Sequence, residues 1–325
     1  FAGSPSEGTG LWKEFPKDFN PSLKAFIEHC WDQKPDERPT FEQILQYIGD
    51  PKSIEAIGGI DLERLYKYQE KVVPDDDVEE EEEETEEEVN EKHHEEEEKE
   101  EIPEFDPNDF TIKPELIKDI TDFEKIGPIG KGQFGIVNKY RDRETGELVA
   151  IKKVQSNLDD INLKREIWIL STFHHPSLQS LYGIIDDSED NEFSMITPFY
   201  AKGDLSNLIT LESKKKIPPE WDLTQKYIAV YGIAAGMYYL HKHNLIHRDL
   251  KPGNVLLNEL FEPIIADFGL SKLIDQNNTM FQTMATGTPV FMAPEVVTSQ
   301  DVGDGVSYDG KAADVYSYGM LCYQL

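Results

Sequence analysis

Four polar residues between positions 249 and 267 have types and spacing that suit chemistry on phosphate groups. Asp249, Lys251 and Asn254 lie close together, and Asp267 follows thirteen residues after Asn254. Transfer of a phosphoryl group spreads charge over the phosphate oxygens, so it requires metal ligands, cations and a positioned acceptor more than a strong base. Carboxylate and amide oxygens are ligands that suit Mg²⁺. Any one of these residues alone would be better explained as part of an Asx turn or a cap.

A glycine-rich segment at residues 130–135, Gly-Lys-Gly-Gln-Phe-Gly, matches the pattern GxGxxG. In a dinucleotide site, a helix follows the glycines and holds a pyrophosphate at its N-terminus. Here residues 136–140 are strand-like and a turn follows at 144–147, so a β-hairpin is expected instead. Glycines in such a hairpin let the backbone cover the phosphates of a nucleotide, because a side chain would hold it away. A purely structural glycine turn is the alternative for the segment by itself.

The complete set of motifs resembles that of the protein kinase family. Five motifs follow one another in the family's order: the glycine-rich segment, Val-Ala-Ile-Lys at 149–152, His-Arg-Asp-Leu-Lys-Pro-Gly-Asn at 247–254, Asp-Phe-Gly at 267–269 and Ala-Pro-Glu at 293–295. The resemblance covers about residues 121–325. It implies an α+β, kinase-like bilobal fold with a small β-rich lobe and a mostly α-helical lobe. The sequence ends within an apolar helical pattern, so we expect the helical lobe to be truncated.

The resemblance also implies ATP and Mg²⁺ as cofactors and a set of site residues. As metal ligands it implies Asn254 and Asp267, as catalytic residues Asp249, Lys251, Lys152 and Glu166, and as nucleotide-binding residues Ile129, Gly130, Lys131, Gly132, Gln133, Phe134, Gly135, Ile136, Val137, Ala150, Lys152, Thr197 and Leu256. Asp249 would accept or orient the substrate hydroxyl, and Lys251 would neutralise the transferring phosphate. Lys152, held by the helical Glu166, would reach the α and β phosphates.

Strand alternation supports part of this site independently of the resemblance. Ala150 and Lys152 are two residues apart, so they point to the same side of a strand at 148–154. Val137, on a neighbouring strand, is expected to cover the same adenine face as Ala150. A surface Lys–Glu pair by itself would be a solvated pair worth less than about 1 kcal/mol. Only the surrounding motifs give Lys152 and Glu166 a function.

Lys251 indicates the substrate class, because a lysine at this place in the family typifies serine/threonine kinases. Gly287-Thr288 indicates the same class, and Thr197 with a hinge at 198–200 resembles the tyrosine-kinase-like group. The implied function is transfer of the γ-phosphate of ATP to a Ser or Thr hydroxyl of protein substrates in intracellular signalling. The alternative is a pseudokinase or scaffold that binds nucleotide and partners without turnover.

Residues 267–295 resemble an activation segment. Its candidate phosphorylation sites are Thr279, Thr283, Thr286 and Thr288. A phosphate adds about −1.5 to −2 units of charge, and we expect it to order the segment against Arg248. Thr288 is better explained as a residue that lines the acceptor site.

Apolar periodicity predicts the elements that must position the site. Strands are expected at 126–129, 134–140 and 148–154, short strands around 246, 255–257 and 264–266, and helices at 163–173 and 223–243. At the front of the chain, Asn20 and Pro21 predict the start of a helix. A second helix is expected at 41–48 and a third at 61–73.

The front of the chain shows a second resemblance to the kinase family. Cys30-Trp31 and Arg38-Pro39-Thr40-Phe41 are similar to the last two helices of a kinase domain, where the arginine pairs with the glutamate of Ala-Pro-Glu. Residues 1–57 are therefore expected to be the C-terminal helices of a preceding domain in a tandem-kinase protein. Residues 11–48 are expected to dock on the truncated lobe, with Arg38 meeting Glu295. A plain helical hairpin is the alternative.

Acidic residues are concentrated between these two parts. Residues 75–101 hold nineteen Asp or Glu and two Lys, a net charge of −17 out of −32 for the whole chain. Such a tract cannot bury enough apolar surface to offset chain entropy, so residues 58–120 are expected to be a largely disordered acidic linker before a kinase domain at 121–325. Its binding to basic partners is a third, weaker function.

The composition also excludes some classes of partner. An acidic chain repels nucleic acid and anionic membrane surfaces. The longest apolar stretch, residues 227–240, is too short to span a bilayer. The two cysteines, Cys30 and Cys322, are far apart in the sequence and form no disulfide pattern, which favours a reducing, cytoplasmic location.

Overall fold

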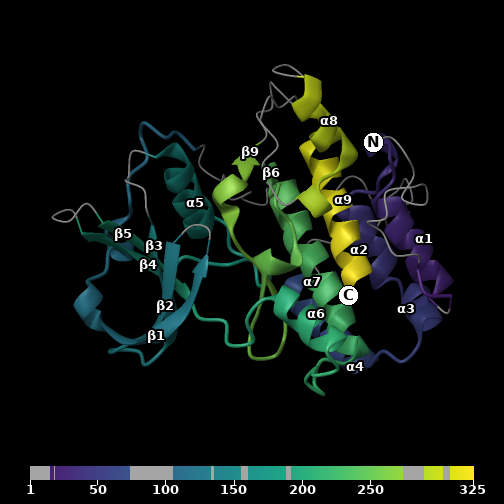
Figure 1. Ribbon diagram of the computed structural model, residues 1–325, viewed down its shortest axis with the longest axis horizontal. Coiled ribbons are helices and arrows are strands. Elements are labelled where there is room, and N and C mark those ends of the chain that lie inside the picture. Colours follow the sequence, from purple (N-terminus) through teal and green to yellow (C-terminus); the bar gives the residue numbers. More distant parts are fainter. Residues whose placement is uncertain are drawn as a thin grey trace, which may run out of the picture.

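The computed structural model describes residues 15–17, 19–73, 105–132, 135–154, 160–187, 192–273, 289–302 and 308–325. Figure 1 shows a small lobe, formed by a β-sheet and one helix, beside a larger and mostly helical lobe. This is the bilobal α+β arrangement that the sequence predicts.

Five antiparallel strands form the sheet of the small lobe. They are β1 (Phe123–Gly132), β2 (Gly135–Asp142), β3 (Leu148–Val154), β4 (Gly183–Asp187) and β5 (Glu192–Pro198), in the spatial order β1-β2-β3-β5-β4. The β2–β3 turn forms because the Asp142 carboxylate accepts hydrogen bonds from the backbone N–H groups of Glu144 and Thr145. Gly146 supplies the positive φ of 77° that the turn requires. Helix α5 (Ile161–Thr172) begins at its cap, Asp160, and its buried side chains belong to the same apolar core as those of β4 and β5.

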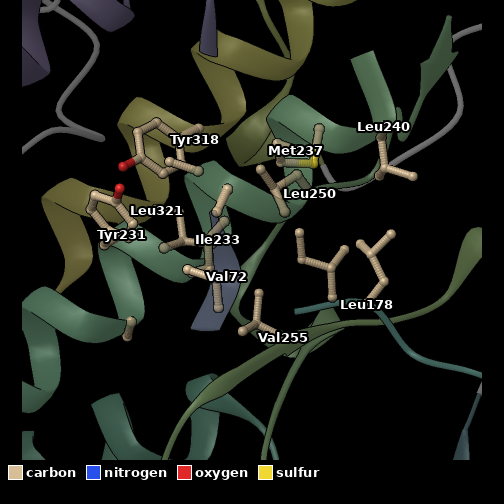
Figure 2. Close-up of a cluster of buried hydrophobic side chains, with 14 of the residues drawn as sticks. Val72, Leu178, Tyr231, Ile233, Met237, Leu240, Leu250, Val255, Tyr318 and Leu321 are labelled. Atoms are coloured by element: carbon tan, nitrogen blue, oxygen red, sulfur yellow. The ribbon is translucent and has the colours of Figure 1, made fainter. Parts of the chain in front are cut away.

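The helical lobe is built around one almost fully buried helix. Its elements are α6 (Leu205–Ser213), α7 (Leu223–Lys242), β6 (Leu245–Ile246), β7 (Val255–Leu257), β8 (Pro263–Ile265), β9 (Lys272–Leu273), α8 (Pro294–Val302) and α9 (Gly310–Gln324). Short 3-10 helices cover Pro35–Glu37, Pro114–Leu116, Ile120–Asp122, Pro252–Asn254, Phe268–Leu270 and Pro289–Phe291. Side chains of α7 are buried on most sides, as expected for a helix at the centre of a core. In Figure 2, Tyr231 and Ile233 of α7 lie beside Tyr318 and Leu321 of α9.

Four helices at the front of the chain pack on this lobe: α1 (Pro21–Cys30), α2 (Phe41–Gly49), α3 (Pro51–Ile57) and α4 (Leu62–Val72). Local signals begin α1 and α2. Asn20 Oδ1 accepts hydrogen bonds from two backbone N–H groups of α1, and Thr40 forms a capping box with Gln43. In Figure 1, α1 and α3 lie on the side of the helical lobe that faces away from the sheet.

Two glycines allow the close packing of the front helices. A Cβ at Gly232 of α7 would lie 2.0 Å from the hydroxyl of Tyr68 in α4, and a Cβ at Gly319 of α9 would lie 2.7 Å from Cys30 Cβ in α1. No side chain larger than hydrogen fits at either place without a shift. Val72 extends the contact into the central core, where Figure 2 shows it beside Ile233.

The structure describes residues 58–73 and 105–120 of the expected acidic linker, residues 58–120. Both segments contain ordered structure. At its start lies α4, and near its end Ile117 forms a parallel bridge with Ile184 of β4. Residues 74–104 lie outside the part of the chain that the structure describes.

The predicted elements agree with the observed ones to within a few residues at their ends. α1 begins where Asn20 and Pro21 predict it, while α2 includes Gly49, which was expected to lie just beyond it. Helices α3, α6 and α8 and strands β4, β5 and β9 were not predicted. Strand β4 is short and lacks apolar alternation, and α3 is only seven residues long.

Candidate active site

Lys152 of β3 and Glu166 of α5 form the ion pair that the sequence predicts. Lys152 Nζ lies 3.5 Å from Glu166 Oε1, and both side chains are largely buried. Burial raises the pKa of Glu166, and the charge of Asp267 adds to this increase, although Lys152 opposes it. The site therefore holds this carboxylate in an environment that disfavours its charge.

This pKa shift predicts a pH-dependent effect of the change Glu166→Gln. The pKa of Glu166 is higher in the folded than in the unfolded protein. The contribution of this carboxyl group to stability is therefore greatest below its unfolded pKa of about 4.3. It is lost as the pH rises through the pKa in the folded protein. We expect Glu166→Gln to raise the free energy of unfolding at pH 7 and to leave it nearly unchanged below pH 4. The same change should lower kcat/KM for ATP by about 10²-fold, because Lys152 loses the group that positions it.

Urea denaturation at the two pH values measures the stability effect. Glu115→Gln, at an exposed position, is the matched control and should change neither quantity. A Glu166→Gln protein that is less stable than the wild type at pH 7 would contradict the prediction.

Asp249 is held in place by the two other polar residues of its loop. Lys251 Nζ lies 2.5 Å from Asp249 Oδ2, and Asn254 Nδ2 donates to Asp249 O and Oδ2 at 2.9 and 3.0 Å. Asp249 itself is 8% exposed. The loop thus presents a carboxylate and a lysine together, as the spacing of the sequence predicts.

Asp314 of α9, a residue that the sequence analysis did not identify, fixes the backbone at the start of this loop. Its carboxylate accepts hydrogen bonds from the backbone N–H groups of His247 and Arg248, both at 2.8 Å, and lies 3.0 Å from His241 Nε2. Burial alone would raise the pKa of Asp314, but the hydrogen bond from His241 and the other donors outweigh it and lower the pKa. Arg248 has a φ of 70°, which is uncommon for a residue with a side chain, so these bonds fix a strained part of the backbone.

The β7–β8 hairpin brings Asp267 to the same loop. Val255 pairs with Ile265, and the N–H of Ala266 donates to Asn254 O at 2.8 Å, so Asp267 follows directly after the residue opposite Asn254. Asp267 has a φ of 67°, another uncommon conformation.

Gly269 lies close to the carboxylates of both Glu166 and Asp267. A Cβ built at Gly269 would be 3.5 Å from Asp267 Oδ1 and 3.5 Å from Glu166 Oε2. The two lobes therefore contribute carboxylates to one small region.

Asn254 and Asp267 fit the ligand chemistry of Mg²⁺. Because Asn254 Nδ2 donates to Asp249, its acceptor atom for a cation is Oδ1. Asp267 supplies a carboxylate beside it. Among the described residues there is no group of three or more His, Cys, Asp and Glu side chains that would hold a metal ion without a further ligand.

The sheet places several of the predicted nucleotide-binding residues on one face. In the antiparallel register, Val137 is opposite Lys152, and Ala150 is opposite Thr197. Opposite residues, and residues two apart on a strand, point to the same side. Val137, Ala150, Lys152 and Thr197 therefore share one face of the sheet.

The glycine-rich segment joins two antiparallel strands, so the hairpin that the sequence predicts is confirmed, and no helix follows the glycines as in a dinucleotide site. Gly130 and Gly132 lie at the end of β1, and Gly132 is opposite Gly135, where β2 begins. Ile129 of β1 is 47% exposed, and Leu256 lies on β7 in the helical lobe. The backbones of Lys131 and Ile136 are opposite one another, whereas Gln133 and Phe134 lie outside the described residues. Nucleotide binding by these residues remains a prediction.

Three cations gather near the predicted activation segment. Burial, followed by the charges of Arg248 and Arg165, lowers the pKa of Lys272, and burial followed by the charge of Arg248 lowers the pKa of Arg165. The three residues come from α5, the loop of Asp249 and β9. Thr279, Thr283, Thr286 and Thr288 lie outside the described part of the chain.

Arg38 and Glu295 form a second buried ion pair, outside the candidate site. Arg38 Nη1 donates to Glu295 Oε1 at 2.6 Å and Nη2 to Oε2 at 2.9 Å. Arg38 also donates to the carbonyls of Asp32 and Ala312, and its guanidinium lies 5.1 Å from the ring of Tyr316. The arginine side chain is completely buried.

No helix within the described residues has both the length and the apolar character needed to cross a membrane.

Comparisons with known proteins agree with this geometry. A family model described as "Protein kinase domain" matches residues 123–325. Serine/threonine-protein kinase 4 homolog B of Dictyostelium discoideum is 34% identical over 67% of this chain and 18% of its own length. Serine/threonine-protein kinase TAO1-B of Xenopus laevis is 36% identical over 62% of this chain and 19% of its own length.

The probable serine/threonine-protein kinase samkB of Dictyostelium discoideum is 32% identical over 67% of this chain and 36% of its own length. The chain thus spans between about a fifth and about a third of the length of these relatives. Since the family model covers more than half of the chain and the two lobes have the arrangement described above, this chain belongs to the protein kinase family.

Proposed function

We propose that this chain is an ATP- and Mg²⁺-dependent protein serine/threonine kinase. The observation that carries the proposal is the meeting of two groups of residues between the lobes. The Lys152–Glu166 pair comes from the sheet lobe, and Asp249 with Lys251 comes from the helical lobe. Asp267, whose charge influences Glu166, connects the two groups.

In this function each residue acts on one part of the transfer. Lys152, positioned by Glu166, binds the α and β phosphates of ATP. Asp249 orients the substrate hydroxyl and accepts its proton, while the hydroxyl oxygen bonds to the γ-phosphorus and the bond to the β-phosphate breaks. Lys251 neutralises charge on the transferring group, and a Mg²⁺ ion held by Asn254 and Asp267 would neutralise the phosphates.

Serine or threonine is the proposed acceptor because of Lys251 and Gly287-Thr288, and because the relatives above are named as serine/threonine kinases. Thr197 and the hinge at 198–200 are the basis for proposing membership of the tyrosine-kinase-like group. Protein substrates, a signalling role and a cytoplasmic location belong to the same proposal. The two cysteines, which the structure shows as free thiols, are compatible with such a location.

Phosphate transfer from radiolabelled ATP to a generic protein acceptor tests this function. We expect labelled phosphoserine or phosphothreonine with the 325-residue chain and Mg²⁺, and none after chelation of the metal. Lys152→Met should reduce the rate by at least about 10²-fold. Lys153→Met, at an exposed neighbouring position, is the matched control and should leave the rate unchanged.

The pseudokinase alternative gives a different result in the same experiment. Such a protein would bind a fluorescent ATP analogue in a manner that depends on Lys152, but would transfer no phosphate under any condition. Transfer that survives Lys152→Met would overturn the assignment of the site.

We also propose that phosphorylation within residues 274–288 orders this segment. The support is the group of Arg165, Arg248 and Lys272, whose charges act on one another. A phosphate carries three acceptor oxygens and about −1.5 to −2 units of charge, so it is suited to neutralise such a group. Thr279 and Thr283 are the proposed sites.

The front helices, in this proposal, dock on the helical lobe of the same chain. The support is the Arg38–Glu295 pair, the hydrogen bond of 2.7 Å from the Tyr227 hydroxyl to Ile48 O, and the glycines beneath Tyr68 and Cys30. A tandem-kinase parent, in which residues 1–57 are the C-terminal helices of a preceding kinase domain, is the proposed origin of these helices.

A further inference from the structure

We propose that residues 105–112, which we call the α5 strap, are a positioning element that holds α5 with Glu166 directed at Lys152. Phe105 is the main anchor of the strap. The inference rests on the proposed function, because the importance of α5 comes from the ion pair that it supplies. It adds a positioning role for a segment that lies before the sheet and outside the kinase motifs.

Aromatic contacts join the strap to α5. The ring of Phe105 lies 5.4 Å from that of Trp168 and 6.1 Å from that of Phe110. The guanidinium of Arg165 lies over the Phe105 ring at 5.8 Å. Phe105, Phe110 and Ile112 are partly buried against the main core of the protein. These contacts remove apolar area from water and restrict the position of α5.

Polar contacts determine the path of the strap and of the chain that follows it. Lys164 Nζ donates to Pro107 O at 2.9 Å, which ties the strap to α5 a second time. Farther on, the N–H of Lys118 donates to Ile184 O at 2.8 Å. A Cβ at Gly183 would lie 2.9 Å from Leu116 O, so this part of the chain is pressed against the start of β4. The strap is thus anchored to the helix, and the chain that follows it is anchored to the sheet.

The strap contacts the side of α5 that faces away from the ion pair. Lys164 and Trp168 are four residues apart and share one side of the helix, and Arg165 is close to it. Glu166 is two residues from Trp168, a rotation of about 200° around the helix axis. A contact at Trp168 therefore supports one side of α5, while Glu166 reaches Lys152 from the opposite side.

The loop after α5 is also supported by a segment from outside the kinase motifs. Trp168 packs edge-on against Phe173 at 5.2 Å, and His175 Nε2 lies 2.8 Å from Val72 O at the end of α4. His175 Nδ1 accepts a hydrogen bond from the N–H of Ser177, and Ser177 Oγ lies 3.1 Å from the Tyr68 hydroxyl. Since this loop is already fixed at its own end, removal of the strap should release mainly the part of α5 that carries Glu166.

Hydrogen exchange of the full 325-residue chain tests the strap without any need for activity. With Phe105→Ala, we expect the backbone amides of α5 to exchange at least tenfold faster, and those of α7 to be unchanged. Phe105→Tyr keeps the ring and should restore wild-type exchange. If Phe105→Ala does not fold, Lys164→Met, which loses only the bond to Pro107, should show the same local effect at a smaller size.

Phe261→Ala is the matched control, because Phe261 makes the same kind of cluster elsewhere. Its ring lies 6.0 Å from Trp221 at an angle of 46°, compared with 43° for Phe105 and Trp168, and Lys202 lies over it at 4.6 Å. This variant should lower stability without faster exchange in α5. The proposed role of the strap would be wrong if the amides of α5 exchanged at the wild-type rate in both Phe105→Ala and Lys164→Met. It would also be wrong if Phe261→Ala increased the exchange rate in α5 as much as Phe105→Ala does.

A double-mutant comparison of activity then tests whether the strap acts through Glu166. Phe105→Ala should lower kcat/KM for ATP about tenfold while leaving KM for the protein acceptor unchanged. In a Glu166→Gln background the same change should cost less than twofold, because the group it positions is gone. Additive losses would show that Phe105 acts in another way and would overturn the role in positioning Glu166. If the wild type transfers no phosphate, the proposed function is wrong. Hydrogen exchange still tests whether the strap holds α5 in place.

Discussion

Asp249→Asn should lower kcat for phosphate transfer by about 10²–10⁴-fold, the usual contribution of a positioned acid or base. Asparagine has the shape of aspartate and can keep the contact with Lys251. It cannot, however, take the proton of a hydroxyl group. Asp249 is buried and fixed by Lys251 and Asn254, so the folded structure of the variant should be unchanged.

The measurement is the rate at saturating ATP and acceptor, together with the affinity for a fluorescent ATP analogue. That affinity should stay within about twofold of the wild-type value, since the Lys152–Glu166 pair is intact. Asp36→Asn, the same substitution at an exposed position, is the matched control. A variant that keeps more than a tenth of the wild-type kcat would show that Asp249 is not the residue that faces the acceptor.

Arg38→Met should lower the free energy of unfolding by about 3–5 kcal/mol, because it leaves Glu295 in a partly buried place without its partner. The guanidinium makes two charge-assisted bonds to Glu295 and further bonds to the carbonyls of Asp32 and Ala312. Methionine keeps the apolar volume of the side chain, so the loss reports mainly on these polar contacts. Urea denaturation measures it.

Arg64→Met provides a matched comparison for this second prediction. Arg64 pairs with Asp222 at 2.7 Å, but these two side chains are 41% and 44% exposed, so its loss should cost less than about 1 kcal/mol. The double variant Arg38→Met with Glu295→Leu should regain a large part of the stability, because neither charge is then left alone. If Arg38→Met costs no more than Arg64→Met, the docking of the front helices on this lobe is wrong.

The sequence predicts those parts of the fold and site that depend on local signals. Asn20 and Pro21 locate the start of α1 because a cap and a first-turn proline act within one turn of helix. Asp249, Lys251 and Asn254 come together because they share one short loop. The alternation of β3 likewise places Ala150 and Lys152 on one face without any knowledge of the tertiary structure.

The parts that the sequence did not predict depend on contacts between distant residues. Asp314 binds backbone groups 66 and 67 positions away, and nothing near it in the chain indicates this role. Cys30 and Cys322 are far apart in the sequence and form no disulfide, yet α1 and α9 bring them close enough for the charge of Cys322 to add to the effect of burial on the pKa of Cys30. Phe105 stands beside an acidic tract, so composition hides its contact with Trp168.

The packing of α1 against α9 affects how the protein folds during synthesis. The two helices are separated by about 280 residues of chain, so a ribosome that adds about 5–20 residues per second completes α9 some tens of seconds after α1. During this interval Phe26, Ile27 and Cys30 lack the surface that later buries them. Contacts of such long range also slow folding itself. The apolar side of α1 is thus a natural substrate for chaperones during synthesis, and its exposure ends only after α9 has emerged.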